Sequence, residues 1–364
     1  MTAELEKSQP NNGQRPDLLD LIESACANAK SSFPRNGQID YGSVLRGWIS
    51  QLEANVLPHT TAGAVSVDGG RLTAHDVEHV RRVRAVCSDL VHQAATALEP
   101  YELVFLLYAV YIHDLGNSLG RDGHERRAND VLDAAQLPMT MDQVENRQAR
   151  DIARAHGGRA AGSKDTIGQL PVQQTIWNFT VRTRLIAAIL RLADELADDP
   201  ARADRVAMRA GTLPREAEVY HHYAAALHSQ VAVAAQRTIE LHFEIYDETL
   251  FTRPLGKGPG ETQFLDEIFE RTLKTYREAR YCSRHLRPLL DFDRVRVTIS
   301  IFDRDNELAQ PISYTIGEHG YGDEVRTIYD LSPELANFEG SRLTAERLAV
   351  LLRPADAANS REPT

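Results

Sequence analysis

The feature that most constrains the fold of this chain is an apolar run that ends at a histidine and an aspartate. The residues from Leu103 to Ile112 are apolar on nearly every side of a helix, and a helix without a polar face must be buried on all sides. We therefore predict that a helix from Tyr101 to His113 lies at the centre of the core, with Gly116 ending it. His113 and Asp114 then stand side by side at the end of a rigid element, where both side chains could bind a metal ion.

Helical periodicity dominates the chain as far as about residue 235. Apolar residues recur at the spacing of one helix face in two long segments and two shorter ones, 73–98, 181–196, 123–135 and 144–156. We predict a mainly α fold in which residues 17–235 form a helical domain. Residues 1–16 are polar and rich in Asn, Gln and Pro, and we expect them to be a disordered tail.

The pattern changes in the last third of the chain. Segments 238–246 and 294–302 alternate with period two, as half-buried strands do, and the segment 262–288 between them is amphipathic. This strand–helix–strand order predicts a small C-terminal α+β appendage with one sheet over residues 236–353. The polar residues 354–364 resemble the N-terminal tail, and we expect them to be disordered as well.

Composition excludes several classes of function and partner. The net charge is −11, from 41 Lys and Arg against 52 Asp and Glu. A nucleic-acid-binding face normally needs an excess of basic residues, so nucleic acid is not a favoured partner. The three cysteines are far apart and form no zinc-binding or disulfide pattern. The N-terminus does not resemble a signal peptide, and no apolar run is long enough to span a membrane. We expect a cytoplasmic protein that does not bind membranes.

Polar residues on the inner faces of the predicted helices extend the His113–Asp114 pair. Asp194 lies one turn after Leu190 on the inner face of its helix, where a carboxylate without a partner is costly. His79 lies at the edge of an apolar stripe, and one such histidine is more often a satisfied core or surface residue than a ligand. The combination is more specific, because four imidazoles and two carboxylates suit Mn, Fe, Co, Ni, Zn or Mg. The six residues are His79, His113, Asp114, His124, His156 and Asp194.

Three segments of the chain resemble the motifs of a known superfamily. HDVEHVRRV at 75–83, YIHDLGN at 111–117 and LRLADEL at 190–196 are similar, in order and context, to the HD superfamily of metal-dependent phosphohydrolases. The resemblance covers roughly residues 40–235. It is strongest to the HD domains found in bacteria beside Hsp90-like ATPase modules. It implies a helical bundle of the HD type that binds a divalent metal, one or two ions per chain, and it admits a homodimer.

The resemblance also implies roles for the six residues. Asp114 would bridge two metal ions, and as the catalytic residue it would orient or deprotonate the attacking water. It would share the second ion with His124 and His156. The first ion would be held by His79, His113, Asp114 and Asp194.

A phosphate substrate needs positive charge beyond the metal ions. Arginine pairs phosphate oxygens through two hydrogen bonds, and among the arginines near the second ion we select Arg127 as a substrate clamp, although any one of them could be a surface residue. His75, one turn before His79, resembles a residue that lines the site but could equally belong to the helix N-terminus. Asn117 stands where some cyclic-dinucleotide phosphodiesterases of the superfamily carry Lys, and no GYP motif follows. Both departures argue against that subgroup.

The leading hypothesis is therefore a phosphohydrolase or phosphodiesterase of the HD type. Its substrate would be a phosphate ester or anhydride of a nucleotide, including cyclic and polyphosphorylated ones. One alternative is a non-catalytic module that senses a nucleotide or binds a partner with the same pocket. Another is a nuclease on single strands, which the net charge of −11 disfavours. HD sites share their ligands across very different phosphate substrates, so the motifs do not identify the substrate or the metal.

Overall fold

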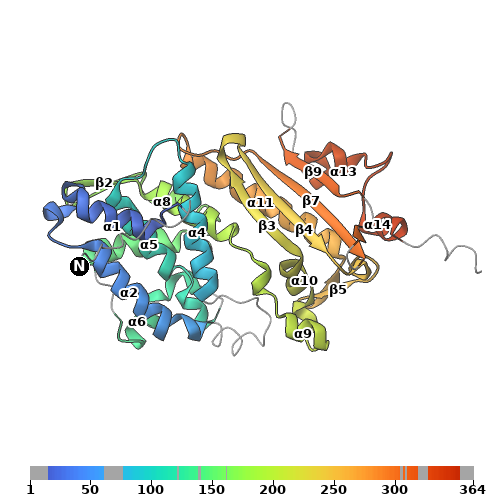
Figure 1. Cartoon of the computed structure of the whole chain (residues 1–364), viewed down its shortest axis with the longest axis horizontal. Helices are drawn as coiled ribbons and strands as arrows, with labels where there is room; N and C mark the ends of the chain where they lie inside the picture. The colour runs from blue at the N-terminus through green and yellow to red at the C-terminus, as the bar shows by residue number, and fades with distance from the viewer. Residues whose placement is uncertain are drawn as a thin grey trace, which may run out of the picture.

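The computed structural model describes residues 15–60, 77–120, 123–137, 141–160, 162–303, 306–307, 310–318 and 327–352. Figure 1 shows a helical part on the left and, beside it, a part built on one β-sheet. The prediction of a mainly α fold with a small α+β part toward the C-terminus is confirmed. Nearly all of the two predicted tails, 1–16 and 354–364, lies outside the described residues.

The apolar helix α5 (Pro100–Ile112) is the centre of the helical part. Every residue from Leu103 to Ile112 is at most 5% exposed, as a helix that is apolar all round requires. Four amphipathic helices surround it, each turning its apolar face inward: α1 (Leu18–Asn28), α4 (Val77–Gln93), α7 (Gln143–Arg154) and α8 (Thr183–Glu195).

The second part is a mixed sheet. Its four main strands lie in the order β3 (Leu227–Val233), β4 (Thr238–Ile245), β7 (Arg294–Asp303) and β9 (Ile312–Gly317). Strands β4 and β7 are parallel, while β3 and β9 pair antiparallel at the two edges. Helix α11 (Phe264–Leu286) connects the parallel pair, since parallel neighbours need a crossover. The predicted strand–helix–strand unit is thus confirmed.

The remaining elements are short except for α2, which packs against α1. The helices are α2 (Tyr41–Asn55), α6 (Ala128–Ala134), α9 (Arg205–Ala210), α10 (Glu218–Ala226), α12 (Ile328–Leu331), α13 (Pro333–Ala336) and α14 (Ala345–Leu351). The strands are β1 (Gln174–Ile176), β2 (Phe179–Val181), β5 (Leu255–Lys257), β6 (Gly260–Thr262) and β8 (Asn306–Glu307). None of the helices described has the length and apolar character needed to cross a membrane.

Three local predictions differ from the structure. The sequence predicts helix as far as about residue 235, but residues 227–233 form strand β3. These seven residues are mixed in polarity and flanked by alanines, so their own sequence does not distinguish a strand from a helix. The helix expected over 123–135 is divided into the 3₁₀ turn η4 (His124–Arg126) and α6. Gly116 does not end α5, which stops at Ile112, but lies inside the following 3₁₀ turn η3 (Leu115–Leu119).

The two parts are joined where α8 packs against α11. Arg191 of α8 forms a two-pronged ion pair with Glu278 of α11, with N–O distances of 2.7 and 2.9 Å. The same guanidinium lies 4.6 Å from the ring centre of Tyr281 and donates to the Thr166 hydroxyl at 2.8 Å. Its side chain is only 8% exposed. This buried contact holds the sheet part in a fixed position beside the helical part.

We predict that Arg191→Met lowers the free energy of unfolding by about 3 kcal/mol, because it leaves the Glu278 carboxylate largely buried without its partner. The double variant Arg191→Met/Glu278→Met removes both charges and should be more stable than the single variant. Chemical denaturation of the wild type, both single variants and the double variant measures this. If the free-energy costs of the two single substitutions simply add in the double variant, the predicted coupling between the two side chains is wrong.

Candidate metal centre

The first group of potential ligands comes from three helices that meet at the end of α5. His79 lies on α4, His113 is the C-cap of α5 and Asp114 follows it, and Asp194 lies in the last turn of α8. One nitrogen or oxygen atom from each of these four residues lies within 4.8 Å of those from the others. The structure thus brings together residues that are up to 115 positions apart in the chain, 194 minus 79.

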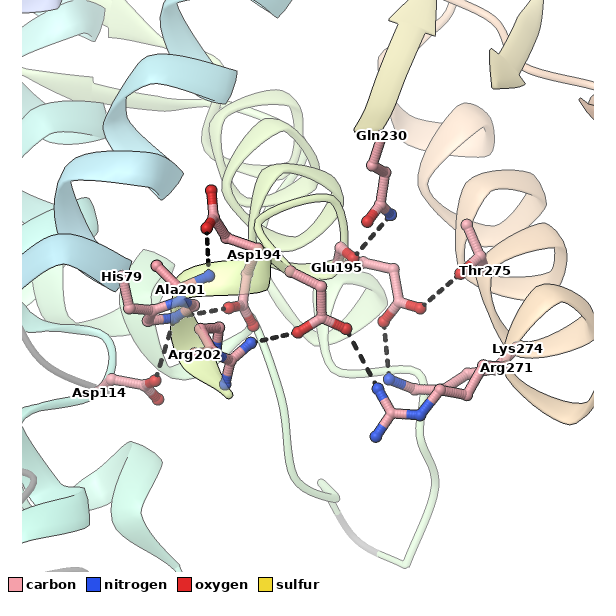
Figure 2. A network of polar contacts seen from close by, with 12 residues as sticks. His79, Asp114, Asp194, Glu195, Ala201, Arg202, Gln230, Arg271, Lys274 and Thr275 are labelled. Atoms are coloured by element: carbon pink, nitrogen blue, oxygen red, sulfur yellow. Dashed lines mark hydrogen bonds and ion pairs between the residues drawn. The ribbon is translucent and has the colours of Figure 1, made fainter. Parts of the chain in front are cut away.

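The imidazole nitrogens of this group face carboxylate oxygens. His79 Nε2 lies 3.3 Å from Asp194 Oδ1 and 3.6 Å from Asp114 Oδ2, and Figure 2 shows His79 between these two aspartates. His113 Nε2 lies 3.5 Å from Asp114 Oδ2 and 3.7 Å from Asp194 Oδ1. Both imidazoles are buried. Two nitrogens and two oxygens therefore surround one point.

A second group shares Asp114 with the first. His124 Nε2 lies 3.2 Å from Asp114 Oδ1, and His156 Nε2 lies 3.5 Å from the same oxygen. The two imidazole nitrogens are 3.4 Å apart. Oδ2 of Asp114 thus faces His79 and His113, while Oδ1 faces His124 and His156. One carboxylate lies between two sets of potential ligands.

The hydrogen bonds of the histidines leave ligand lone pairs facing one another. His113 Nδ1 donates to the Val110 carbonyl at 2.8 Å, and His156 Nδ1 donates to the Ala153 carbonyl at 2.6 Å. Each ring, when neutral, then carries a lone pair on Nε2, and among the described residues the buried Nε2 of His113 has no hydrogen-bond partner. Lone pairs that converge on carboxylate oxygens require a cation between them. The donor set of imidazole and carboxylate fits a divalent metal, with each ring oriented by a backbone carbonyl.

The electrostatics of the centre agree with this donor set. Burial alone lowers the pKa of His113, but the carboxylates of Asp114 and Asp194 outweigh it and raise this pKa to about 9. Burial acts in the opposite direction on the two aspartates. The facing imidazoles nevertheless hold the pKa of Asp114 and that of Asp194 well below the usual value. Both carboxylates therefore stay ionised and attract positive charge into the centre.

Gly116 permits the approach of the segment that carries His124. A Cβ atom at this position would lie 2.0 Å from the carbonyl oxygen of His124, a distance that real Cβ atoms do not reach. Only glycine therefore allows the turns η3 and η4 to pack so closely and place His124 beside Asp114. The sequence shows the glycine, but its role depends on a contact between two turns that no local pattern encodes.

The centre opens into a cavity of about 1100 Å³ that lies between the two parts of the molecule. The helical part contributes the metal-centre side chains to its lining, together with Asn117. The opposite wall comes from α10, β5 and α11 of the sheet part, which contribute Tyr220, Lys257, Glu267, Glu270, Arg271, Lys274 and Glu278.

The last turn of α8 is tied to the opposite wall. Figure 2 shows Glu195, the residue after Asp194, bound to Lys274 and Thr275 of α11. Lys274 Nζ donates to the Glu195 carboxylate at 2.7 Å, and the Thr275 hydroxyl donates at 2.9 Å. Gln230 of β3 donates to the Glu195 carbonyl at 3.2 Å. The sheet part therefore fixes the backbone that presents the Asp194 carboxylate to the metal centre.

The two residues selected as substrate-binding from the sequence have different outcomes. Arg127 does not line the cavity, and its guanidinium donates to the Leu119 carbonyl at 2.6 Å. Its neighbour Arg126 does line the cavity, as does Arg159. His75 lies outside the described residues. The lysine and arginine residues of α11 were missed, because they are distant in sequence from every motif.

Comparison with known families shows which family the chain matches. The model of the HD-CE family matches residues 58–273, which is more than half of the chain. The match includes all six potential metal ligands and extends through β3 and β4 into α11. A search of curated proteins finds no match.

We predict that Gly116→Ala weakens metal binding at the group formed by Asp114, His124 and His156 by about tenfold or more, since the added methyl group displaces His124. The other group should keep its ion. Titration with Mn²⁺ and elemental analysis of metal content measure both. Gly47→Ala is the control, because Gly47 lies in α2 and none of the described residues has an atom within 4 Å of the added carbon. Unchanged binding at both groups would exclude this role for Gly116.

The raised pKa of His113 predicts a pH dependence for the metal-free protein. With a folded pKa of about 9 against 6.5, proton binding stabilises the fold fully below pH 6.5, and this contribution is lost as the pH rises through 9. The melting temperature of the metal-free wild type should therefore exceed that of His113→Gln at pH 6.5 and below, and this difference should shrink as the pH rises to 9. Added metal should restore the wild type at the upper end, because the ion replaces the proton. A difference that is independent of pH would contradict the assignment.

Proposed function

The chain belongs to the HD-CE family, and from this premise we propose that it is a metal-dependent phosphohydrolase that hydrolyses a phosphate ester or anhydride of a nucleotide. The observation that carries the proposal is the arrangement of Asp114, whose two oxygens face two separate pairs of imidazoles. A shared carboxylate of this kind suits a pair of divalent ions, and such pairs serve hydrolysis at phosphorus.

Each residue of the centre has a role in this proposal. His79, His113 and Asp194 would hold one ion together with Asp114, and His124 and His156 would complete the site for a second. A bound divalent ion lowers the pKa of its water and offsets the charge of a transferring phosphoryl group.

Asp114 would do more than hold ions. Its pKa lies well below the usual value, so it stays ionised and accepts a hydrogen bond from the attacking water. This bond orients the water toward the cavity. Asp114 is only 9% exposed, so its surroundings keep most bulk water away and strengthen these electrostatic interactions.

The cavity supports a substrate of nucleotide size. Its volume of about 1100 Å³ lies just above the usual range of small-molecule pockets, about 300–1000 Å³. Asn117, next to the metal centre, is 3% exposed and lines this cavity. Some phosphodiesterases of the superfamily that act on cyclic dinucleotides carry Lys at this place, so the neutral amide argues against that subgroup.

The experiment that tests the function compares the wild type with His113→Ala/Asp114→Ala. We expect the wild type to bind one or two ions per chain and to hydrolyse at least one member of a panel of mono-, poly- and cyclic nucleotides with Mn, Co, Ni or Mg. The variant should lose bound metal, and its rate should fall by more than about a hundredfold. Elemental analysis and phosphate release measure the two effects.

The control for this experiment is His228→Ala/Glu244→Ala. It removes a histidine and a carboxylate from a partly exposed pair on β3 and β4, whose nearest atoms are 3.3 Å apart and which forms a third group of potential ligands with His242. This variant should keep its activity and the metal of the Asp114 centre. A wild type that binds nucleotide and metal but hydrolyses nothing would instead be a non-catalytic sensing module. A wild type that binds no metal after reconstitution would contradict the proposal as a whole.

A further inference from the structure

The cationic side chains that line the cavity differ in whether they have acidic partners. Two of them, Arg159 and Lys164, have no carboxylate partner among the residues that the structure describes. Arg126 has a more distant acidic partner, since its Nε lies 3.6 Å from Glu125 Oε1. The other five each pair with a carboxylate of the same cavity: Arg191 with Glu278, Lys257 with Glu267 and Glu270, Arg202 and Arg271 with Asp198, and Lys274 with Glu195.

The unpaired cations lie on the side of the second ligand group. Both belong to the segment that follows His156, which begins with Gly157 and Gly158. Gly158 adopts a φ of +69°, and a Cβ atom there would lie 2.6 Å from a carboxylate oxygen of Glu125. The glycine thus lets the segment turn closely against η4.

Arg126 completes this side of the cavity. Its Nη2 donates to the Arg159 carbonyl at 3.1 Å, so the turn η4 and the segment after His156 lie together. Lys164 is placed next to the buried part of the interface, because its own carbonyl accepts from Arg191 at 3.4 Å. Three cations from these segments therefore line the cavity that also contains the second ligand group.

The two sides of the cavity consequently suit different chemical groups. On the α11 side, the carboxylates of Glu195, Asp198 and Glu267 already neutralise the cations, and they offer hydrogen-bond acceptors to hydroxyl and amino groups. On the other side, unpaired cations attract an anion, and arginine can bind phosphate oxygens through two hydrogen bonds. A molecule with a nucleoside at one end and a phosphate chain at the other matches this division.

We propose that Arg159 and Lys164, assisted by Arg126, form a subsite for a second phosphate group of the substrate. The chain would then prefer substrates with at least two linked phosphates, such as nucleoside diphosphates and longer polyphosphates, to monophosphates. This proposal rests on the proposed function, because the first phosphate is taken to lie at the metal centre.

Binding of two non-hydrolysable probes tests the subsite. Methylenediphosphonate carries two linked phosphonate groups and methylphosphonate carries one, so their comparison isolates the second anion. Calorimetric titration of the metal-loaded full chain should show at least about tenfold tighter binding of the diphosphonate. Elemental analysis after each titration verifies that the protein keeps its metal.

The variant Arg159→Gln/Lys164→Gln should lose most of this preference, while methylphosphonate binding changes less than about threefold. The control variant Arg209→Gln/Lys30→Gln removes the same two charges from residues that do not line the cavity, and should keep the preference. Equal weakening of both probes, an unchanged preference in the first variant, or no preference in the wild type would each overturn the subsite.

The outcomes also separate this inference from the proposed function. Because the readout is equilibrium binding, a chain that hydrolyses no nucleotide but shows the predicted preference would refute the function and retain the subsite. A chain that hydrolyses nucleotides yet binds both probes equally would retain the function and refute the subsite.

Discussion

The carboxylate of Asp114 is the constraint on which the rest of this structure depends. A buried carboxylate needs compensating positive charge, and each oxygen of Asp114 faces a pair of imidazoles at 3.2–3.6 Å. The rings of His113 and His156 are in turn held by backbone carbonyls at helix ends. Because the carbonyl end of a helix carries partial negative charge, it also favours a cation nearby. The position of the centre at the end of α5 therefore follows from simple electrostatics.

A centre of this kind requires a support that does not move. The support is α5, whose apolar surface is covered on all sides by other helices. Such a helix cannot rotate or shift without breaking the close packing of its side chains against the surrounding helices, so the residues that follow it keep their place. The helices α4, α7 and α8 that cover it also carry or precede His79, His156 and Asp194. The contacts that pack the core therefore also hold the potential ligands in place.

The sequence predicts the parts of this arrangement that local patterns encode. The periodicity of α5 and α8 and the alternation of β4 and β7 identify these elements to within a few residues. The structure also brings the six expected ligands into two groups. Contacts between distant segments have no local signature. The packing of Gly116 against His124 is one example, and the pairing of Glu195 with Lys274 is another. Strand β3 was missed for a related reason, since partners in the sheet, rather than its own short sequence, determine its conformation.

The potential metal ligands and the cavity wall that faces them come from different parts of the chain. The ligands come from short motifs on the helical part, so the chemistry can be inferred from the motifs alone. The wall that faces them comes from α10, β5 and α11, and its charges are balanced by carboxylates that include Glu195 at the end of α8 and Asp198 just after it. Substitutions on α11 can therefore change what the cavity accepts without altering a single ligand. Under the proposed function, this separation would let one set of metal ligands serve different phosphate substrates, with specificity set by the sheet part and by the segment after His156.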